Sequence, residues 1–483
     1  MNRKKISSYL GNILLIEALL LGIPAGLSIY FREKAFLSFA FTIALLAVAG
    51  ILCIKIKPET GAIHAREGYV IVGLAWILMS AFGALPFFIS GCIPNYINAL
   101  FETVSGFTTT GSTILDDIEV LPKSILFWRS FTHFIGGMGI LVFALAVMPK
   151  SDDGGDMHIM RAEVPGPTVG KLVSKIRATA TILYGIYCGM TLVLVILLII
   201  GGMPVFDSFC NAFATAGTGG FGLLNSSIAG YNSYYCEMVI AVFMILFGTN
   251  FNLYYLIIRK KIGLALKNEE LHWYLGFIAF ATAVITINLF STEHWLDDSF
   301  RYAFFQVASI ISTTGFSTAD FDKWPQISKT TLFILMFIGG MGGSTGGGLK
   351  VNRVIIAIKS GIRSIKNAIN PKLVQSVKVD DEPVDENLVK SVALYVSNLF
   401  AILFVSVFII SLDGYDFTET ISSVVACASN VGPGFGWCGP SGNFSSFSAL
   451  SKIVLILDML IGRLEIIPIL ILFARGFRLR KYN

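Results

Sequence analysis

Long apolar segments, separated by short polar or glycine-rich stretches, recur from one end of the chain to the other. A helix needs about 20 apolar residues to cross the hydrocarbon core of a bilayer. The apolar runs predict spanning helices over residues 9 to 30, 35 to 54, 68 to 91, 124 to 148, 178 to 202, 236 to 258, 272 to 291, 328 to 355, 389 to 412 and 450 to 474. Ten such runs are typical of an all-α polytopic membrane protein.

Four shorter apolar stretches, each of about a dozen residues, precede the fourth, sixth, eighth and tenth of these helices. Stretches of this length are typical of re-entrant half-helices. The layout predicts an extra N-terminal helix pair over 1–66, then four pseudo-repeats of helix, re-entrant pore helix, filter and helix around one pore. The repeats are expected at 67–149, 150–260, 261–366 and 367–483.

A glycine-centred segment follows each predicted half-helix. The segments read Thr108-Thr109-Thr110-Gly111, Ala216-Gly217-Thr218-Gly219, Ser312-Thr313-Thr314-Gly315 and Ser429-Asn430-Val431-Gly432. Their last glycines are 108, 96 and 117 residues apart, and Phe101, Phe209 and Phe305 lie ten residues before the first three. Ordinary Gly/Thr turns explain one or two such segments but not four at equivalent places, so we expect four-fold pseudosymmetry.

The chemistry of these segments suits a dehydrated cation. Rings of backbone carbonyls replace the water around an ion, and glycine lets the chain turn its carbonyls toward an axis. Small Thr and Ser side chains can pack behind such a filter, and a half-helix ending there directs its negative dipole end inward. The predicted ion ligands are Thr109, Thr110, Gly111, Gly217, Thr218, Gly219, Thr313, Thr314, Gly315, Asn430, Val431 and Gly432.

The eighth predicted helix is interrupted by a glycine-rich run over residues 339 to 350. Each Gly costs about 1 kcal/mol relative to Ala in a helix, so this run predicts unwound backbone that lines the pore below the filter. A phosphate-binding loop is the alternative. Gly343 to Gly348 matches its GxxxxG spacing, but Leu349 separates the last glycine from Lys350, and Val351 follows, which argues against nucleotide binding.

Two charged residues, Arg463 and Glu465, lie inside the last predicted span. Two interpretations stay open. They form a structural pair with each other or with a buried carbonyl, or Arg463 places a positive charge under the filter and regulates cation passage. Glu102 in the first half-helix and the exofacial residues Asp116, Asp117 and Glu119 are expected to raise the cation concentration at the pore mouth, with solvated surface charge as the alternative for the last three.

Composition agrees with a membrane protein. The chain is 54% hydrophobic and 14% charged, with a mean hydropathy of +0.73. With the N-terminus inside, 27 of the 36 Lys and Arg residues fall in cytoplasmic segments, so both termini are predicted to be cytoplasmic. The loops at 149 to 177 and 359 to 388 are then available to a soluble partner. Nucleic acid is not an expected partner.

The seven cysteines and five histidines form no metal-binding spacing. The cysteines are interpreted as packing residues, with an exofacial disulfide left open, and the histidines as interfacial or packing residues. Residues 9 to 30 are long for a signal peptide and lack a good cleavage site, so they are expected to remain as a first helix.

Together the motifs resemble the Trk/Ktr/HKT superfamily of potassium transporters, most closely its bacterial TrkH branch. The resemblance covers essentially the whole chain. It rests on SGFTTTGST at 105–113, TGGF at 218–221, STTGFST at 312–318, NVGPG at 430–434 and GGSTGGGLK at 342–350. The extra N-terminal helix pair is similar to TrkH and not to the shorter KtrB-type subunit.

The resemblance implies potassium uptake in the bacterial inner membrane, with K⁺ as the transported ion and no cofactor in this chain. It further implies a homodimer and a cytosolic TrkA-type regulatory ring that binds nucleotides. The loop at 339 to 350 then corresponds to the intramembrane gate of the family. The implied gate residues are Gly340, Gly342, Gly343, Gly346, Gly347, Gly348, Lys350 and Arg463.

Other functions remain to be weighed against a channel-like potassium pore. The same fold suits a symporter that couples potassium to protons or sodium. A potassium-binding subunit of a pump is a further alternative, which requires a separate ATPase. An enzyme is not expected, because the sequence has no nucleophile-base or metal cluster.

Overall fold

The computed structural model describes residues 3–55, 64–139, 176–290, 296–372 and 375–473. Regular structure in these ranges is almost entirely α-helical, apart from four short 3₁₀ turns and the two-residue antiparallel strands β1 (Lys378–Val379) and β2 (Glu382–Pro383). This confirms the all-α prediction. Most of the predicted loop at 149 to 177 and the end of the predicted span at 124 to 148 lie outside the described residues.

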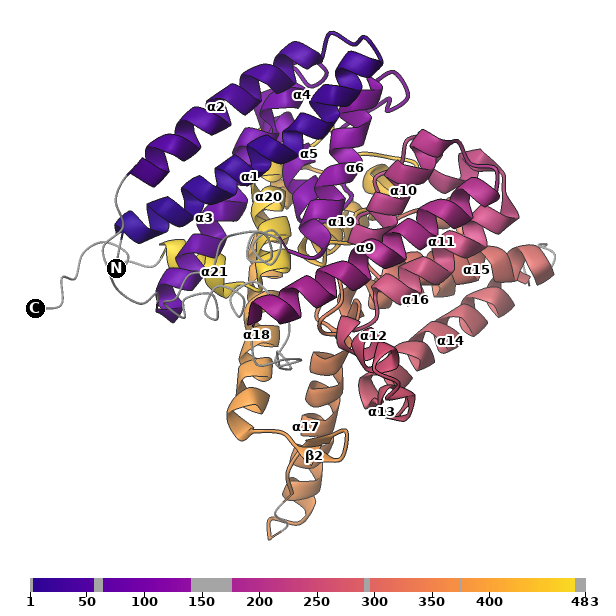
Figure 1. The fold of residues 1–483 in the computed structure, drawn as a ribbon. Coiled ribbons are helices and arrows are strands. Elements are labelled where there is room, and N and C mark those ends of the chain that lie inside the picture. The colour runs from indigo at the N-terminus through magenta and orange to yellow at the C-terminus, as the bar shows by residue number, and fades with distance from the viewer. Residues whose placement is uncertain (1–2, 56–63, 140–175, 291–295, 373–374, 474–483) are drawn as a thin grey trace, which may run out of the picture.

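The contacts between helices close eight of them into a ring, and each of these helices is labelled in Figure 1. Each pore helix packs between the helix that follows it in its own repeat and the corresponding helix of the preceding repeat. In order of contact around the ring they are α5 (Tyr96–Phe107), α6 (Lys123–Gly137), α10 (Val205–Gly217), α11 (Tyr234–Phe247), α15 (Leu296–Ile311), α16 (Gln326–Ile338), α19 (Phe417–Ala428) and α20 (Ala449–Leu464), which returns to α5. The contacts therefore give the four-fold pseudosymmetry that the repeated segments predict.

A longer outer helix covers each pore helix. These helices are α3 (Ala65–Gly83), α9 (Ile176–Ile200), α14 (Glu269–Phe290) and α18 (Glu386–Ile410), and each contacts the pore helix of its own repeat. The extra pair, α1 (Arg3–Tyr30) and α2 (Phe36–Lys55), lies outside repeat 1, where α1 contacts α3 and α6 and α2 contacts α4 (Leu85–Ile89). A Cβ on Gly11 would lie 2.7 Å from the carbonyl oxygen of Gly50, so small residues let these two backbones approach closely.

Six helical spans in the described residues are long and apolar enough to cross a membrane, or seven if the bent pair over residues 234–258 counts as one. The six match the predicted spans at 9 to 30, 35 to 54, 68 to 91, 178 to 202, 272 to 291 and 389 to 412. The helices that follow the filters differ from the continuous spans predicted for them. Residues 236 to 258 bend by 93° between α11 and α12 (Phe251–Ile258), and residues 450 to 474 break between α20 and α21 (Ile467–Phe473). The continuous helices predicted at these two places are therefore wrong, while the total of ten spans stays a prediction.

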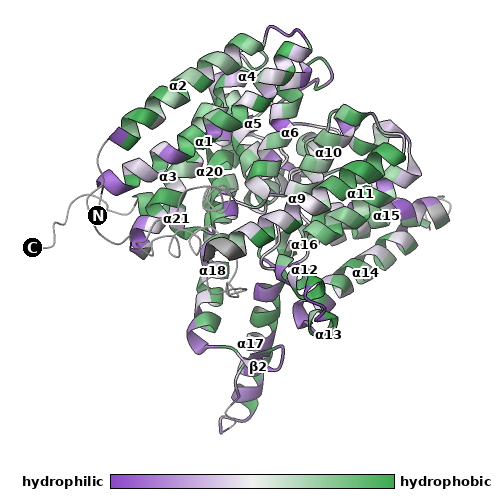
Figure 2. Ribbon diagram, in the orientation of Figure 1, coloured by the Kyte–Doolittle hydropathy of each residue, from purple (hydrophilic) through white to green (hydrophobic). Residues whose placement is uncertain are grey.

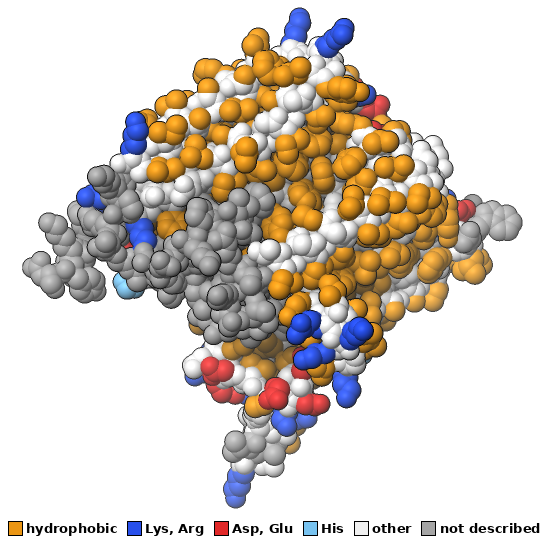
Figure 3. Space-filling model, viewed as in Figure 1, with side chains coloured by type: hydrophobic (Ala, Val, Ile, Leu, Met, Phe, Trp, Pro, Cys, Tyr) orange, Lys and Arg blue, Asp and Glu red, His pale blue; other side chains and the backbone are white. Residues whose placement is uncertain are grey.

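The surface divides into an apolar body and a charged projection. Figures 2 and 3 show hydrophobic residues over the helices of the body, whereas acidic and basic side chains gather on the lower projection. The projection consists of α17 (Val351–Ile369), β1, β2 and the first part of α18. Ile356, Val377, Val389 and Val392 form a small apolar cluster within it. The remaining short elements are α13 (Ile262–Leu266), η1 (Ser227–Tyr231), η2 (Phe321–Lys323), η3 (Ser411–Asp413) and η4 (Gly436–Cys438).

Candidate ion filter and gating loop

The four pore helices end in the same turn. The residues in the left-handed conformation there are Thr109, Thr218, Thr313 and Asn430, with φ of 55°, 54°, 60° and 55°. The next N–H in each repeat donates to the carbonyl five residues earlier at 2.8 to 2.9 Å, from Thr110 to Ser105, Gly219 to Ala214, Thr314 to Ser309 and Val431 to Ala426. This Schellman-type ending leads each helix directly into its filter segment.

A second positive φ follows two residues later and lies on a glycine in every repeat. These glycines are Gly111, Gly220, Gly315 and Gly432, with φ of 84°, 74°, 86° and 100°. The predicted alignment on Gly219 is therefore wrong by one residue, and Gly219 itself matches Thr110. The residues ten positions before the glycines support the corrected register. Cys210, ten residues before Gly220, is fully buried like Phe101 before Gly111, whereas Phe209, ten residues before Gly219, is 38% exposed. Gly219 and Gly220 are adjacent, so the sequence alone left the register ambiguous.

The filter segments form a second, inner ring. A Cβ added to any of the four glycines would press on a carbonyl oxygen of another repeat. The pairs are Gly111 with Gly219, Gly220 with Thr314, Gly315 with Val431, and Gly432 with Thr110. Each glycine thus meets the carbonyl of the next repeat and has no space for a side chain. These four carbonyl oxygens accept no hydrogen bond from the described part of the chain, which leaves them available to an ion.

Hydroxyl groups support the first and third filter segments from behind, as the sequence predicts, and a side-chain amide supports the fourth. The hydroxyls of Thr108 and Thr110 lie 2.7 Å apart, and those of Ser312 and Thr314 lie 2.7 Å apart in the third repeat. In the fourth repeat, Asn430 Nδ2 donates to Thr110 Oγ1 at 2.9 Å and to the carbonyl of Met459 at 3.0 Å. The second repeat has Gly217 and Gly219 at the positions of Thr108 and Thr110 and therefore lacks this support.

A cavity of about 130 Å³ lies against the inner ring and is lined by all four glycines, Gly111, Gly220, Gly315 and Gly432. Asp116 lines both this cavity and a neighbouring one of about 470 Å³. Asp320, Asp322 and Glu419 line the larger cavity only. Carboxylates around such an opening raise the local cation concentration. The predicted mouth thus holds Asp116, with three acidic residues from later repeats that the sequence did not single out.

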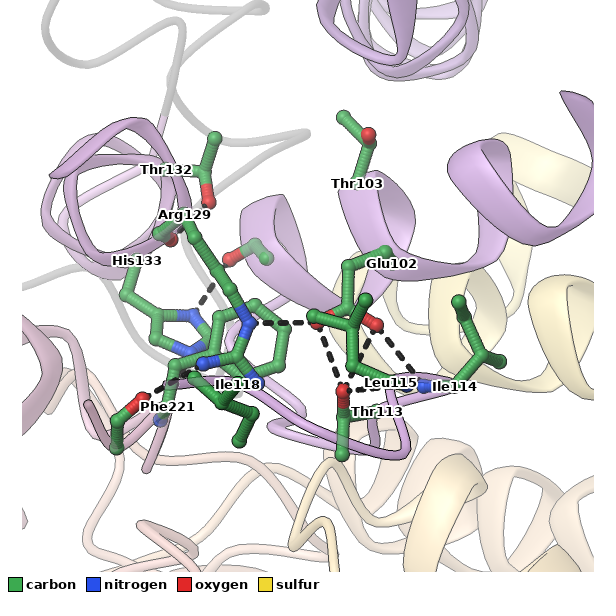
Figure 4. Close-up of polar contacts among 12 residues, drawn as sticks. Glu102, Thr103, Thr113, Ile114, Leu115, Ile118, Arg129, Thr132, His133 and Phe221 are labelled. Carbon is green, nitrogen blue, oxygen red and sulfur yellow. Dashed lines mark hydrogen bonds and ion pairs between the residues drawn. The ribbon is translucent and has the colours of Figure 1, made fainter. Parts of the chain in front are cut away.

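The other acidic residues proposed for the mouth have structural roles. Glu102 is fully buried, and its Oε1 lies 2.6 Å from Nε of Arg129, so it is not at the pore mouth (Figure 4). Asp117 and Glu119 accept hydrogen bonds from the side chain and the backbone N–H of Asn225 at 2.9 and 3.0 Å. These contacts tie the loop after the first filter to the loop after the second.

The glycine-rich loop between α16 and α17 lies directly against the inner ends of two filter segments. The N–H of Gly347 donates to Thr313 Oγ1 at 2.6 Å, and Cβ atoms on Gly346 and Gly347 would lie 2.9 and 2.5 Å from the carbonyl oxygens of Ser312 and Ser429. The interruption predicted at 339 to 350 is therefore present. Its backbone occupies the space that a continuous helix would have taken through the third repeat.

The bend in the second repeat holds one side of this loop. The N–H of Met341 donates to the carbonyl of Gly248 at 2.9 Å, and the N–H of Phe251 donates to the carbonyl of Gly343 at 3.1 Å. Glu270 at the start of α14 accepts hydrogen bonds from the N–H groups of Gly342 and Asn352 at 2.7 and 3.1 Å. The break between α11 and α12 thus exposes backbone groups that anchor the loop. Sequence reasoning missed Glu270, although an acidic residue at the edge of an apolar span was a signal.

Arg463 joins three parts of the ring. Its guanidinium donates to the carbonyl of Thr345 in the loop at 2.7 Å, and to the carbonyls of Gly136 and Gly137 at the end of α6 at 2.5 and 2.6 Å. Glu465 instead lies 2.5 Å from Arg353, so the proposed pairing with Arg463 is wrong. Lys350 Nζ donates to the carbonyl of Gly346 within the loop. Two buried basic side chains therefore bind loop carbonyls.

Two of the seven cysteines pack close to the filter, with Cys427 Sγ 3.5 Å from Ser112 Oγ and Cys438 lining the cavity at the inner ring. All seven are free in the structure, so the disulfide left open by the sequence is not formed. No group of His, Cys, Asp and Glu with the arrangement of a metal site occurs among the described residues.

Comparisons with known proteins agree with this geometry. The profile of the family described as "TrkH: Cation transport protein" matches residues 32–478, which include all four filter segments and the loop. The Trk system potassium uptake proteins TrkH of Salmonella typhimurium and Escherichia coli K12 are 35% and 34% identical to this chain, over 99% of both chains in each case. The crystal structure of the potassium transporter TrkH from Vibrio parahaemolyticus has a TM-score of 0.89 at 30% identity, covering 99% of this chain and 100% of that one.

Proposed function

The chain belongs to the TrkH family of cation transport proteins and is a potassium uptake transporter of the membrane, and we propose that the potassium ion passes through the inner ring of filter segments. One observation carries this proposal. The carbonyl oxygens of Thr110, Gly219, Thr314 and Val431 lie in a closed ring of repeats, without hydrogen-bond partners in the described residues. Such a ring supplies the oxygens that replace the water around a potassium ion.

The proposed ion ligands come from all four repeats. The full proposed set is Thr109, Thr110, Gly111, Gly217, Thr218, Gly219, Thr313, Thr314, Gly315, Asn430, Val431 and Gly432, to which the corrected register adds Gly220. Each pore helix directs its C-terminal, negative dipole end toward this set, which favours a cation over an anion. The proposed repeat boundaries at 67, 150, 261 and 367 stay a prediction.

We propose that the loop at 339 to 350 gates the pore. Its contacts with Thr313 Oγ1 and its closeness to the carbonyl of Ser429 support this role, because backbone so close beneath the filter obstructs an ion leaving it. The moving part comprises Gly340, Gly342, Gly343, Gly346, Gly347, Gly348 and Lys350, with Arg463 as its anchor. The positive charge of Arg463 adds an electrostatic barrier for cations.

We propose that the chain lies in the bacterial inner membrane with both termini in the cytoplasm, because Lys and Arg concentrate in the segments assigned to that side. The charged projection of α17, β1, β2 and α18 then faces the cytoplasm. An ion pair of Arg363 with Glu386 joins α17 to α18 within it, and one of Lys359 with Glu269 joins it to the start of α14. We propose this projection as the surface for a cytosolic TrkA-type nucleotide-binding ring, in a homodimeric transporter, as the resemblance to the TrkH branch implies.

The proposal is tested by rubidium and sodium uptake in cells that lack their own potassium importers. The intact chain is compared with Gly315→Ser, because a side chain there would press on the carbonyl of Val431. We expect the variant to lose its preference for rubidium over sodium. Unchanged growth and selectivity in a variant that is present at normal levels in the membrane would contradict the filter assignment.

Electrical recording then separates a channel-like pore from a coupled symporter. Purified protein in a bilayer is expected to carry potassium currents at equal pH on both sides and without sodium. A strict requirement for a proton or sodium gradient would contradict the channel-like mechanism while leaving the filter assignment intact.

A further inference from the structure

The second filter segment is built differently from the others. In the first repeat, Thr108 and Thr110 place hydroxyls behind the filter, and the third repeat uses Ser312 and Thr314 in the same way. The matching residues of the second repeat are glycines, which have no side chain to hold their backbone and lose more conformational freedom on ordering than any other residue. Another part of the molecule must therefore hold this segment in place.

His133 of α6 occupies the space behind these glycines. A Cβ on Gly219 would overlap the imidazole ring, with Cγ and Nδ1 as its nearest neighbours, and a Cβ on Gly217 would overlap the backbone of His133. The ring is fully buried and lies 4.1 Å from that of Phe221, measured between centroids. The side chain of His133 thus fills the place that the Thr110 side chain fills in the first repeat.

The hydrogen bonds of His133 fix its tautomer. Nδ1 lies 2.7 Å from the carbonyl oxygen of Gly106, and because a carbonyl only accepts, Nδ1 carries the proton. Nε2 is then free to accept the N–H of Phe221, which lies 3.2 Å away (Figure 4). A neutral imidazole therefore links the pore helix of repeat 1 to the filter backbone of repeat 2.

Arg129, one helical turn before His133 on α6, extends this link. Its NH1 donates to the carbonyl of Gly222 at 2.8 Å, and its guanidinium lies 3.7 Å from the ring centroid of Phe221. Its Nε donates to Glu102, whose carboxylate also accepts from Thr113 Oγ1 at 3.0 Å and from the N–H of Ile114 at 3.0 Å. Arg129 and Glu102 thus connect the segments that follow the first and second filters (Figure 4).

We propose that His133 and Arg129, with Glu102, are positioning residues that set the ion selectivity of the second filter segment. The inference rests on the proposed filter. It assigns to α6 of repeat 1 the support that the glycines of repeat 2 cannot provide. Without this support the carbonyl of Gly219 is less constrained, and we expect the filter to distinguish potassium from sodium less well.

Substitutions of His133 separate positioning from simple packing. Asparagine places an amide N–H near the position of Nδ1 and keeps the bond to Gly106, whereas glutamine reaches far enough to accept from Phe221. Rubidium and sodium fluxes are measured with the purified, full-length protein in liposomes. We expect His133→Asn to lower the rubidium-to-sodium flux ratio by roughly fivefold or more, and His133→Gln to retain more of it. Equal ratios for the wild type and both variants would overturn the proposal.

A double-mutant cycle between His133 and Gly219 tests the contact itself. Gly219→Ala alone should lower selectivity, because its methyl group would overlap the imidazole ring. In the background of His133→Ala the same methyl group has space, so the loss caused by Gly219→Ala should be smaller. Additive losses would contradict the contact. Should His133→Ala fail to fold, the comparison of asparagine with glutamine still decides.

The matched control is the ion pair of Arg301 with Glu237. It has the same shortest distance, 2.6 Å, as the pair of Arg129 with Glu102, and it joins α15 to α11 away from the inner ring. We expect Arg129→Gln to lower the flux ratio and Arg301→Gln to leave it unchanged. Gly315→Ser distinguishes a failure of the filter assignment from a failure of the positioning role. If it too leaves the ratio unchanged, the filter assignment fails. If it alone lowers the ratio, the filter stands and the positioning role fails.

Discussion

The guanidinium of Arg463 and the carbonyl oxygen of Thr345 are joined by a 2.7 Å hydrogen bond between the last helix of the ring and the glycine-rich loop. The same side chain also binds two carbonyls at the end of α6. These contacts make Arg463 a structural anchor, and the cationic barrier that we propose for it resides on the same side chain. A change at Arg463 removes both effects together, and both losses favour ion passage.

Replacement of Arg463 by Ala is expected to raise the basal rate of rubidium entry by roughly fivefold or more, because the loop loses an anchor and the pore loses a positive charge. Arg463→Lys keeps the charge but offers a more compact donor, so its rate should lie between the two. The measurement is tracer uptake by liposomes without any regulatory partner. Lys267→Ala, at an exposed position away from the pore mouth, is the control. A wild-type rate in Arg463→Ala would exclude this role.

Glu270 is expected to hold the loop from the other side. Glu270→Ala leaves the N–H groups of Gly342 and Asn352 without their acceptor, at a cost of about 1 to 3 kcal/mol for each such buried group. The variant should therefore melt at a lower temperature and conduct rubidium faster. Glu270→Gln keeps a carbonyl acceptor and should be close to wild type in both measurements. Faster flux in the Gln variant than in the Ala variant would contradict the anchoring role.

The acidic residues at the mouth are expected to act through long-range electrostatics. Asp116→Asn combined with Asp322→Asn removes two negative charges from the larger outer cavity. The potassium concentration for half-maximal uptake should rise at low ionic strength, and the difference should vanish in concentrated salt, where the charges are screened. A shift of the same size at every ionic strength would indicate a local structural effect.

Much of the architecture could be predicted from local sequence patterns. Four apolar half-helices, each followed by a glycine-centred segment, were sufficient to predict the pore helices and the ring, because these signals lie within short stretches of one chain. The register of the second filter was not predictable, since Gly219 and Gly220 are neighbours and only the folded backbone distinguishes them, through the positive φ of Gly220 and its contact with the next repeat. The bend after Phe247 was also missed, because the surrounding run is apolar enough to be a span.

Contacts between repeats were the other part that the sequence could not provide. Glu102 was interpreted as a residue of the pore mouth, because its partner Arg129 lies 27 positions away and the sequence does not show that the two form a pair. His133 was interpreted as an interfacial or packing residue, because the glycines that it contacts lie in another repeat. Such pairs arise from the closure of the ring, which no local pattern records.

The most direct test of the four filter segments as the path of the ion is the potassium-to-sodium permeability ratio of Gly220→Ala. The ratio is taken from the reversal potential of the purified protein between potassium and sodium solutions. A Cβ on Gly220 would press on the carbonyl of Thr314, and its φ of 74° is strained for alanine. Gly189→Ala is the control, because no atom lies within 4 Å of the added Cβ. We expect the ratio to fall by about tenfold or more in Gly220→Ala and to stay unchanged in Gly189→Ala. A folded Gly220→Ala protein with the wild-type ratio would contradict the ring of four filter segments as the path of the ion.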